Sequence, residues 1–184
     1  TFLVCLFALT FGIVEPSTAT ETNEDIYKFL NASSRIWVYN TSEVNEGNIT
    51  CRYDDRVNIT QEKIFFYRHN NTRRELLKGK FVNWTYPDSK TYETYDAMYV
   101  TDSGDKPVTD EVIEYVSRDN SCAVFSVTLM RTDETVVLRE IRVSEEALKS
   151  GPDESCKEKF EKILTAAKKT ARSQYSPTCR SQQR

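Results

Sequence analysis

Histidine is almost absent from this chain: its 184 residues include a single one, His69. A Ser-His-Asp triad needs a histidine as its base, and zinc sites usually combine histidines with cysteines. His69 precedes the polar pair Asn70-Asn71, a turn signal, so we expect a solvated hairpin residue. The spacing C-x-x-C, typical of zinc sites, is also missing. These absences argue against an enzyme, and we expect neither a metal ion nor a cofactor.

An excess of positive charge is missing as well. The chain carries 25 Lys and Arg against 28 Asp and Glu, a formal net charge of −3. Binding to nucleic acid would require a basic face. The basic cluster of Lys168, Lys169 and Arg172 falls in the last turns of a predicted helix, where it complements the helix dipole. We therefore expect no nucleic-acid partner.

The chain has one long apolar run, residues 2–14. This run is too short to span a membrane, which needs about 20 residues. Glu15-Pro16 ends the run, and the small residues 17–19 follow it, as at a signal-peptide cleavage site. The pattern predicts a signal peptide over residues 1–19 and a single mature domain over residues 20–184. We therefore expect a secreted, extracellular monomer with no membrane anchor.

The chain is rich in N-x-S/T acceptor sites for glycosylation. Six of them lie in one third of the sequence, at Asn31, Asn40, Asn48, Asn58, Asn70 and Asn83. One such triplet arises easily by chance, but six behind an apolar leader indicate a secreted glycoprotein. We expect these asparagines on surface loops or on outward-facing strand positions.

The cysteines agree with an oxidising compartment. Cys5 belongs to the predicted leader, and an even number remains, namely Cys51, Cys122, Cys156 and Cys179. Four cysteines in a secreted domain predict two disulfides. Three pairings are possible, and the spacing alone does not choose among them.

Most of the chain between residues 35 and 143 alternates with the period of a β-strand. Roughly eight runs rich in β-branched and aromatic residues are separated by short polar turns, which predicts an antiparallel meander closed into a barrel, or a sandwich. A short helix is expected before them, over residues 23–30, with Asn23 as its N-cap.

A second helix is expected near the end of the chain. Its apolar side is a narrow stripe, Cys156, Phe160, Ile163, Leu164 and Ala167, and Ser155 with Glu158 forms a capping box. The stripe predicts a helix packed on the outside of the strands. Because Cys156 lies on that face, a strand cysteine such as Cys122 is its natural partner, which leaves Cys51 for Cys179.

Several segments together resemble the tick salivary lipocalins, the histamine-binding protein family. They are the strand Arg35-Ile36-Trp37-Val38-Tyr39, the strand that ends at Cys51, the acidic strand that leads to Cys122, the run Glu140-Ile141-Arg142-Val143, and the terminal segment with Cys179. The resemblance implies a mainly β protein with an eight-stranded antiparallel lipocalin-type barrel, a short N-terminal helix and a C-terminal helix packed outside. It also implies the disulfides Cys51–Cys179 and Cys122–Cys156.

The function that the resemblance implies is a scavenger that sequesters a small host mediator, first of all histamine or another biogenic amine, and so counters host defence. A buried ammonium needs carboxylates and aromatic faces in place of water. Glu140 matches one amine-binding acid of the family, and Asp110 or Glu111 matches another. Tyr99 and Trp37 are expected to line the cavity.

Arg142 departs from the family pattern, which has tryptophan at this position. Strand alternation places Glu140 and Arg142 on one face. If both point inward, Arg142 neutralises Glu140 and suits an anionic lipid such as an eicosanoid or a fatty acid. Alternatively, both form a solvated pair where the strand leaves the barrel. A third function remains open, a protein-binding immune evasion lipocalin whose barrel is filled by its own side chains.

Overall fold

A computed structural model describes residues 24–42, 50–71, 73–85, 87, 94–131 and 133–183. The predicted signal peptide and Asn48 lie outside these residues. Strand is the commonest structure in the described chain, and two α-helices and a short 3-10 helix flank the strands. In chain order the elements are α1 (Ile26–Ala32), β1 (Arg35–Thr41), β2 (Tyr53–Ile59), β3 (Lys63–Asn70), β4 (Arg73–Val82), β5 (Ala97–Asp102), β6 (Pro107–Val116), β7 (Cys122–Leu129), β8 (Val136–Ser144), α2 (Glu154–Ala166), β9 (Arg172–Ser173) and η1 (Pro177–Gln183).

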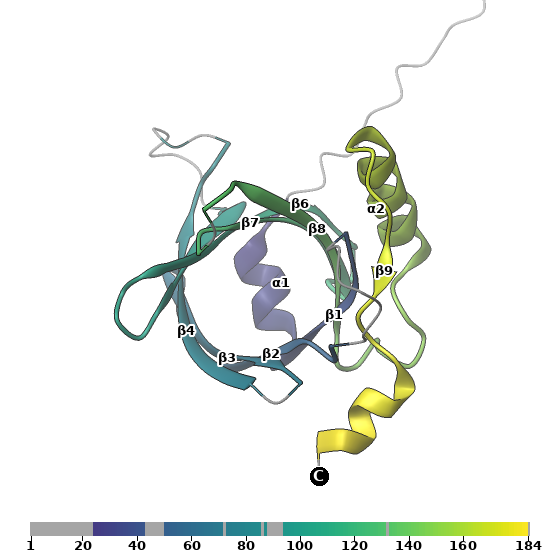
Figure 1. Ribbon diagram of the computed structural model, residues 1–184, viewed down its shortest axis with the longest axis horizontal. Coiled ribbons are helices and arrows are strands. Elements are labelled where there is room, and N and C mark those ends of the chain that lie inside the picture. Colours follow the sequence, from purple (N-terminus) through teal and green to yellow (C-terminus); the bar gives the residue numbers. More distant parts are fainter. Residues whose placement is uncertain are drawn as a thin grey trace, which may run out of the picture.

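The strands β1 to β8 close into an antiparallel barrel rather than a sandwich (Figure 1). Each strand from β2 to β8 pairs with the next, β8 pairs with β1, and β1 pairs with β2 to complete the circle. The closing pair β1–β2 is short, running from Arg35↔Asp55 to Trp37↔Tyr53. The two-residue strand β9 adds to β1 outside this circle. The eight-stranded barrel that the sequence implied is therefore confirmed.

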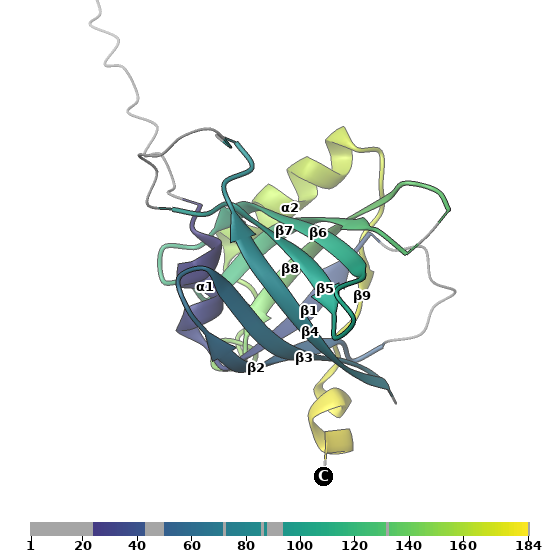
Figure 2. The ribbon, with the colours of Figure 1, turned by 90° about the vertical axis from the view of Figure 1, so that its left-hand side faces the viewer.

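The short helix α1 fills one end of the barrel (Figures 1 and 2). Its apolar residues Ile26, Phe29 and Leu30 recur at helical spacing and are buried among the inward-facing strand residues. Its N-cap is Asp25, whose carboxylate accepts a hydrogen bond from the Lys28 backbone N–H, and not Asn23 as expected. Because α1 occupies this end, the interior there is a packed apolar core.

The helix α2 packs on the outer face of the barrel, as its apolar stripe predicted. Cys156, Phe160 and Leu164 form a second apolar cluster with outward-facing residues of the strands, including Ile141 and Val143 of β8. Its N-cap is Asp153, which accepts from the Ser155 backbone N–H at 2.8 Å, so the expected Ser155–Glu158 capping box is not formed. None of the helices in the described part of the chain is long and apolar enough to cross a bilayer.

Two disulfides fix the outer elements to the barrel. Cys122–Cys156 joins α2 to β7, and Cys51–Cys179 joins the C-terminal segment to the residues just before β2. Both pairs are those that the sequence led us to expect. The tail is therefore held close to the start of β2, where the barrel closes.

Candidate functional site

Six charged side chains meet inside the barrel and form what we call the charge network. They are Arg52, Asp54, Arg68, Glu111, Glu140 and Arg142. Arg52 directly precedes β2, and the others lie on β2, β3, β6 and β8. Three are basic and three are acidic. Strand alternation brings them to the interior together with apolar neighbours such as Phe66 of β3 and Leu138 of β8.

Arg142 lies at the centre of this network and is buried. Its Nη1 is 2.6 Å from Oε2 of Glu111, and its Nε and Nη2 are 2.9 Å and 2.8 Å from Oε2 of Glu140. The guanidinium also lies 4.4 Å from the centre of the Phe125 ring. Glu140 and Arg142 therefore both face inward, and the alternative of a solvated pair at the end of the strand is wrong.

Two further arginines occupy the remaining carboxylate oxygens. Arg68 donates to both oxygens of Asp54, at 2.9 Å and 2.8 Å, and to Oε1 of Glu111 at 2.9 Å. Arg52 donates to Oε1 of Glu140. The hydroxyl of Thr109 adds a bond of 2.8 Å to Oε1 of Glu111. Every carboxylate oxygen of the charge network thus already accepts at least one hydrogen bond.

The network keeps Glu111 and Arg68 charged. Burial by itself raises the pKa of Glu111, but the guanidinium groups of Arg142 and Arg68 outweigh it and hold that pKa well below its usual range. Burial likewise lowers the pKa of Arg68, whereas Asp54 and Glu111 raise it further, so the net shift is upward. A fixed array of opposite charges results, and neither group changes its charge near neutral pH.

This array makes stability depend on pH. Because the pKa of Glu111 is lower in the folded than in the unfolded chain, its contribution is present above about pH 4.3, the usual pKa of a glutamate, and is lost as the pH falls. We expect the free energy of unfolding, measured with urea from neutral to acid pH, to fall less steeply in Glu111→Gln. The control is Asp110→Asn on the outer face, where burial raises the carboxyl pKa. A slope in Glu111→Gln equal to that of the unmodified protein would contradict this prediction.

Not all the residues expected to contact a ligand face the interior. Trp37 is buried outside the barrel, between the rings of Tyr53 and Tyr175 at 4.6 Å and 5.3 Å, because its neighbours Ile36 and Val38 point inward. Tyr99 is 41 % exposed and packs edge-on against Trp84. Neither lines the cavity, which corrects the expectation from the sequence.

The choice between Asp110 and Glu111 follows from the same alternation. The side chain of Glu111 is fully buried in the barrel, whereas Asp110 lies opposite the outward-facing Tyr99 and is half-buried. Of the two acids, Glu111 joins Glu140 and Arg142. The ligand-binding role of these three residues stays a prediction.

Sequence reasoning missed half of the charge network, namely Arg52, Asp54 and Arg68. A signal was present in β3, where Ile64, Phe66 and Arg68 alternate with the outward-facing residues, so that an arginine extends a face of apolar core residues. That signal identifies an inward arginine, but it does not reveal its partners on β2 and β6.

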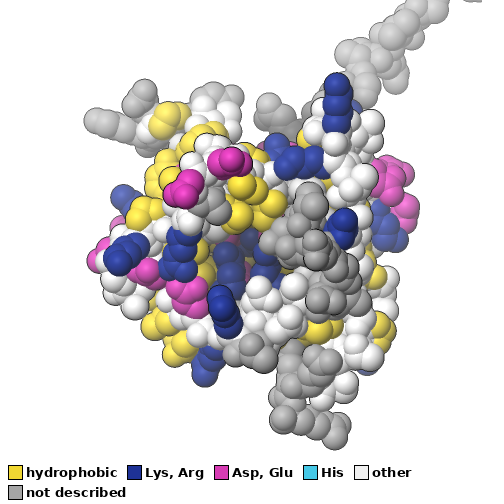
Figure 3. All heavy atoms as spheres, viewed as in Figure 1, with side chains coloured by type: hydrophobic (Ala, Val, Ile, Leu, Met, Phe, Trp, Pro, Cys, Tyr) yellow, Lys and Arg dark blue, Asp and Glu magenta, His cyan; other side chains and the backbone are white. Residues whose placement is uncertain are grey.

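The charge network is accessible from the end of the barrel opposite α1. The side chains of Arg52, Arg68 and Asp54 are 15 %, 16 % and 13 % exposed, while those of Glu111 and Glu140 are fully buried. Figure 3 looks into this end and shows Lys and Arg side chains gathered around a hollow. A ligand that enters here meets guanidinium groups before it meets a carboxylate.

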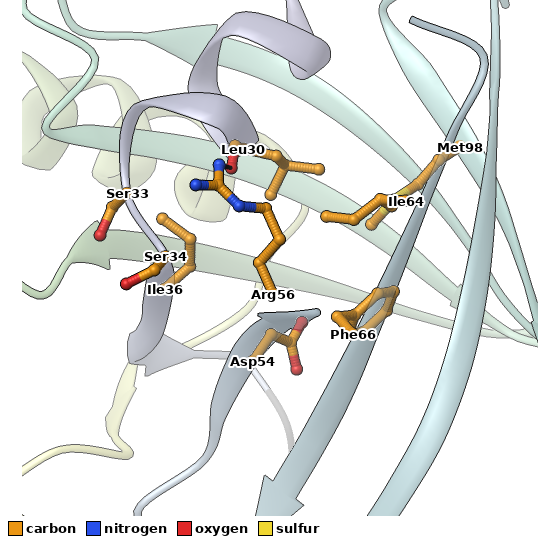
Figure 4. Close-up of a pocket in the computed structure, with 9 residues that line it drawn as sticks. All are labelled: Leu30, Ser33, Ser34, Ile36, Asp54, Arg56, Ile64, Phe66 and Met98. Atoms are coloured by element: carbon orange, nitrogen blue, oxygen red, sulfur yellow. Dashed lines mark hydrogen bonds between the residues drawn. The ribbon is translucent and has the colours of Figure 1, made fainter. Parts of the chain in front are cut away.

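A small cavity lies at the other side of the interior, next to α1 (Figure 4). Its walls are Leu30, Ser33, Ser34, Ile36, Asp54, Arg56, Ile64, Phe66 and Met98. Its volume, about 10 Å³ for the centre of a water molecule, is that of a single water site. This cavity as it stands does not hold an organic ligand.

The structure also bears on glycosylation and on metal binding. Among the glycosylation acceptors, Asn31, Asn58 and Asn70 are exposed, and Asn40 and Asn83 are half-buried. Glycosylation stays a prediction. In the described ranges no group of three or more His, Cys, Asp or Glu side chains is arranged to hold a metal ion.

Two solved structures of other proteins can be compared with this chain. A structure of the siderocalin Ex-FABP, described as functioning through dual ligand specificities, superposes with a TM-score of 0.57 at 8 % identity over 79 % of this chain and 90 % of that one. A bovine odorant-binding protein, a deswapped triple mutant, gives 0.47 at 12 % identity over 77 % and 92 %. The first likeness supports the lipocalin fold alone.

The sequence itself has no match among curated proteins. A family model described as tick histamine binding protein, however, matches residues 15–181. That match covers the whole barrel, both disulfides and α2. The chain therefore belongs to the tick histamine-binding protein family.

Proposed function

We propose that this protein is a secreted scavenger that captures a small host mediator bearing a carboxylate, such as an eicosanoid or another fatty-acid derivative, at the open end of its barrel. The family is one of lipocalin-type small-ligand binders, and such barrels enclose a single small ligand. The observation that carries the proposal is that the carboxylates of the charge network already accept hydrogen bonds from arginines.

A biogenic amine would need a free buried carboxylate. Glu111 and Glu140 are each held by two arginines, with Arg142 shared between them. An ammonium placed beside either acid would have to displace one of these guanidinium groups, which would then lose a counter-charge inside the barrel. The network therefore opposes a cation.

An anion meets the opposite situation. Each guanidinium carries five N–H donors in one plane, more than its carboxylate partners accept. Arg52 and Arg68 are the most exposed basic members of the network and lie toward the open end. A ligand carboxylate can bind to them with charge-assisted, bidentate geometry. Apolar inward-facing residues such as Val127 and Leu138 offer contacts for a hydrocarbon chain.

Histamine is the second candidate. The family description names it, and the chain does place two acids, Glu111 and Glu140, inside the barrel. For histamine to bind there, one of the arginines that hold these acids has to release its partner. An amine binder would thus have to rearrange the charge network.

A calorimetric titration panel tests the proposal. We expect an arachidonate-derived carboxylate to bind at least tenfold more tightly than histamine or serotonin, and its methyl ester, which lacks the charge, to lose at least tenfold, about 1.4 kcal/mol. Arg52→Gln should weaken the carboxylate by a similar factor, whereas Arg118→Gln on the exposed β6–β7 turn should not. Tighter binding of histamine than of the carboxylate would overturn the proposal in favour of the amine.

A further inference from the structure

A second polar hollow lies on the outside of the barrel, where β1 and β2 meet and close to the end of α1. We call it the outer groove. Its volume is about 510 Å³, and its walls are Ser34, Arg35, Asp55, Arg56, Val57, Tyr67, Arg74 and Glu145. It shares no residue with the charge network. Volumes of about 300–1,000 Å³ are usual for sites that hold small organic ligands.

Two guanidinium groups in this groove have no carboxylate partner within the described residues. Arg74 of β4 lies flat over Tyr67, with its guanidinium carbon 3.6 Å from the ring centre. Arg56 of β2 also lines the interior cavity next to α1 (Figure 4). It donates to the backbone oxygen of Leu30 at 2.9 Å and to Oδ1 of Asn31 at 3.2 Å, both neutral acceptors. Both cations are therefore held in position by groups that leave their charge uncompensated.

The acids of the groove, in contrast, are already paired. Asp55 accepts from Nε and Nη2 of Arg35, the latter at 3.0 Å. Glu145 accepts from the guanidinium of Arg180 and from the indole N–H of Trp37. With its acids neutralised in this way, the groove presents a net positive surface to solvent.

We propose that the outer groove is a second binding site, for an organic phosphate or sulfate ester. Guanidinium groups bind tetrahedral oxyanions through paired N–H donors, and Arg74 stacked on Tyr67 loses little side-chain freedom when it does so. The exposed side chain of Val57, 57 % accessible, gives the organic part of the ligand an apolar contact. The size of the groove suits a nucleotide or a sulfated disaccharide better than a bare ion.

The test is a titration of the intact protein, followed by calorimetry and by the amide NMR signals of β2 to β4. ADP represents the phosphate esters and a trisulfated heparin disaccharide the sulfate esters, while adenosine and the desulfated disaccharide are the matched uncharged ligands. We expect at least one charged ligand to bind at least tenfold more tightly than its uncharged counterpart, with shifts centred on Tyr67 and Arg74. Which of the two binds tells a phosphate source from a sulfate source.

Variants locate the site. Arg74→Gln and Arg56→Gln should each weaken the charged ligand at least fivefold, and Arg118→Gln, remote from the groove, should leave it unchanged. Asp55→Asn removes a competing acceptor and should tighten binding, a gain that a folding defect cannot produce. Arg52→Gln, which acts at the open end of the barrel, should have no effect here. The proposal fails if neither charged ligand exceeds its uncharged counterpart, or if both Arg74→Gln and Arg56→Gln leave the affinity within twofold.

Discussion

Replacement of Arg142 by leucine is expected to lower the free energy of unfolding by about 3–5 kcal/mol. Arg142 is buried and is bound to both Glu111 and Glu140, so its removal leaves two buried carboxylates with one arginine each. The stacking of its guanidinium on Phe125 is lost in the same step. Urea denaturation at neutral pH measures the change directly.

Arg139 provides the matched control, because it lies on the same strand with its side chain on the outer face. It pairs with Glu114 at 3.3 Å, and both side chains are partly exposed, 21 % and 26 %. Arg139→Leu should therefore cost about 1 kcal/mol or less. Equal losses in the two variants would mean that the charge network contributes nothing beyond an ordinary surface pair.

The substitution Arg142→Leu also distinguishes the two ligand classes, when binding is measured on the fraction of the protein that remains folded. Without Arg142, Glu140 keeps Arg52 as its basic partner and becomes a better counter-charge for an ammonium. Amine affinity should then rise or hold, while the affinity for a fatty-acid carboxylate should fall at least tenfold because the basic character of the interior is reduced. An unchanged affinity for both classes would place the ligand away from Arg142.

The features that the sequence predicted are those set by local periodicity and by cysteine chemistry. Alternation placed Glu140 and Arg142 on one strand face, whereas the direction of that face stayed open in the sequence and follows from the burial of both side chains in the structure. The apolar stripe of α2 predicted both its outside position and the partner of Cys156. In these cases one element supplies all the information that the inference needs.

Predictions of which face of a strand points into the barrel were less accurate. In β1, Ile36 and Val38 face the interior while Trp37 packs under Tyr175 of the C-terminal segment, so both faces are apolar and the pattern does not tell inside from outside. For Asp110 and Glu111 a shift of one residue exchanges the two faces. Arg68 needs partners from β2 and β6, strands that meet only once the barrel is closed.

Loss of the disulfide Cys51–Cys179 is the other change expected to have a large effect. It joins residues 128 apart in the sequence, and on the chain-entropy account a loop of that length stabilises the folded state by about 5 kcal/mol. The bond Cys122–Cys156, with a separation of 34, corresponds to about 4 kcal/mol. The double variant Cys51→Ser/Cys179→Ser should therefore lose more stability in urea than Cys122→Ser/Cys156→Ser.

The contacts around the longer loop explain why the tail needs this bond. The C-terminal segment is held to the barrel by Gln174, which accepts hydrogen bonds from Thr50, and by the ring of Tyr175 against Trp37. Together with the pairing of β9 to β1, these contacts cover the outer side of the site where β1 and β2 close the barrel. Without the disulfide, hydrogen exchange should accelerate first in β9 and in β1. If exchange instead accelerates first in α2, the C-terminal segment does not protect β1 and β2. The disulfide Cys122–Cys156 would then contribute more to the stability of the fold than Cys51–Cys179.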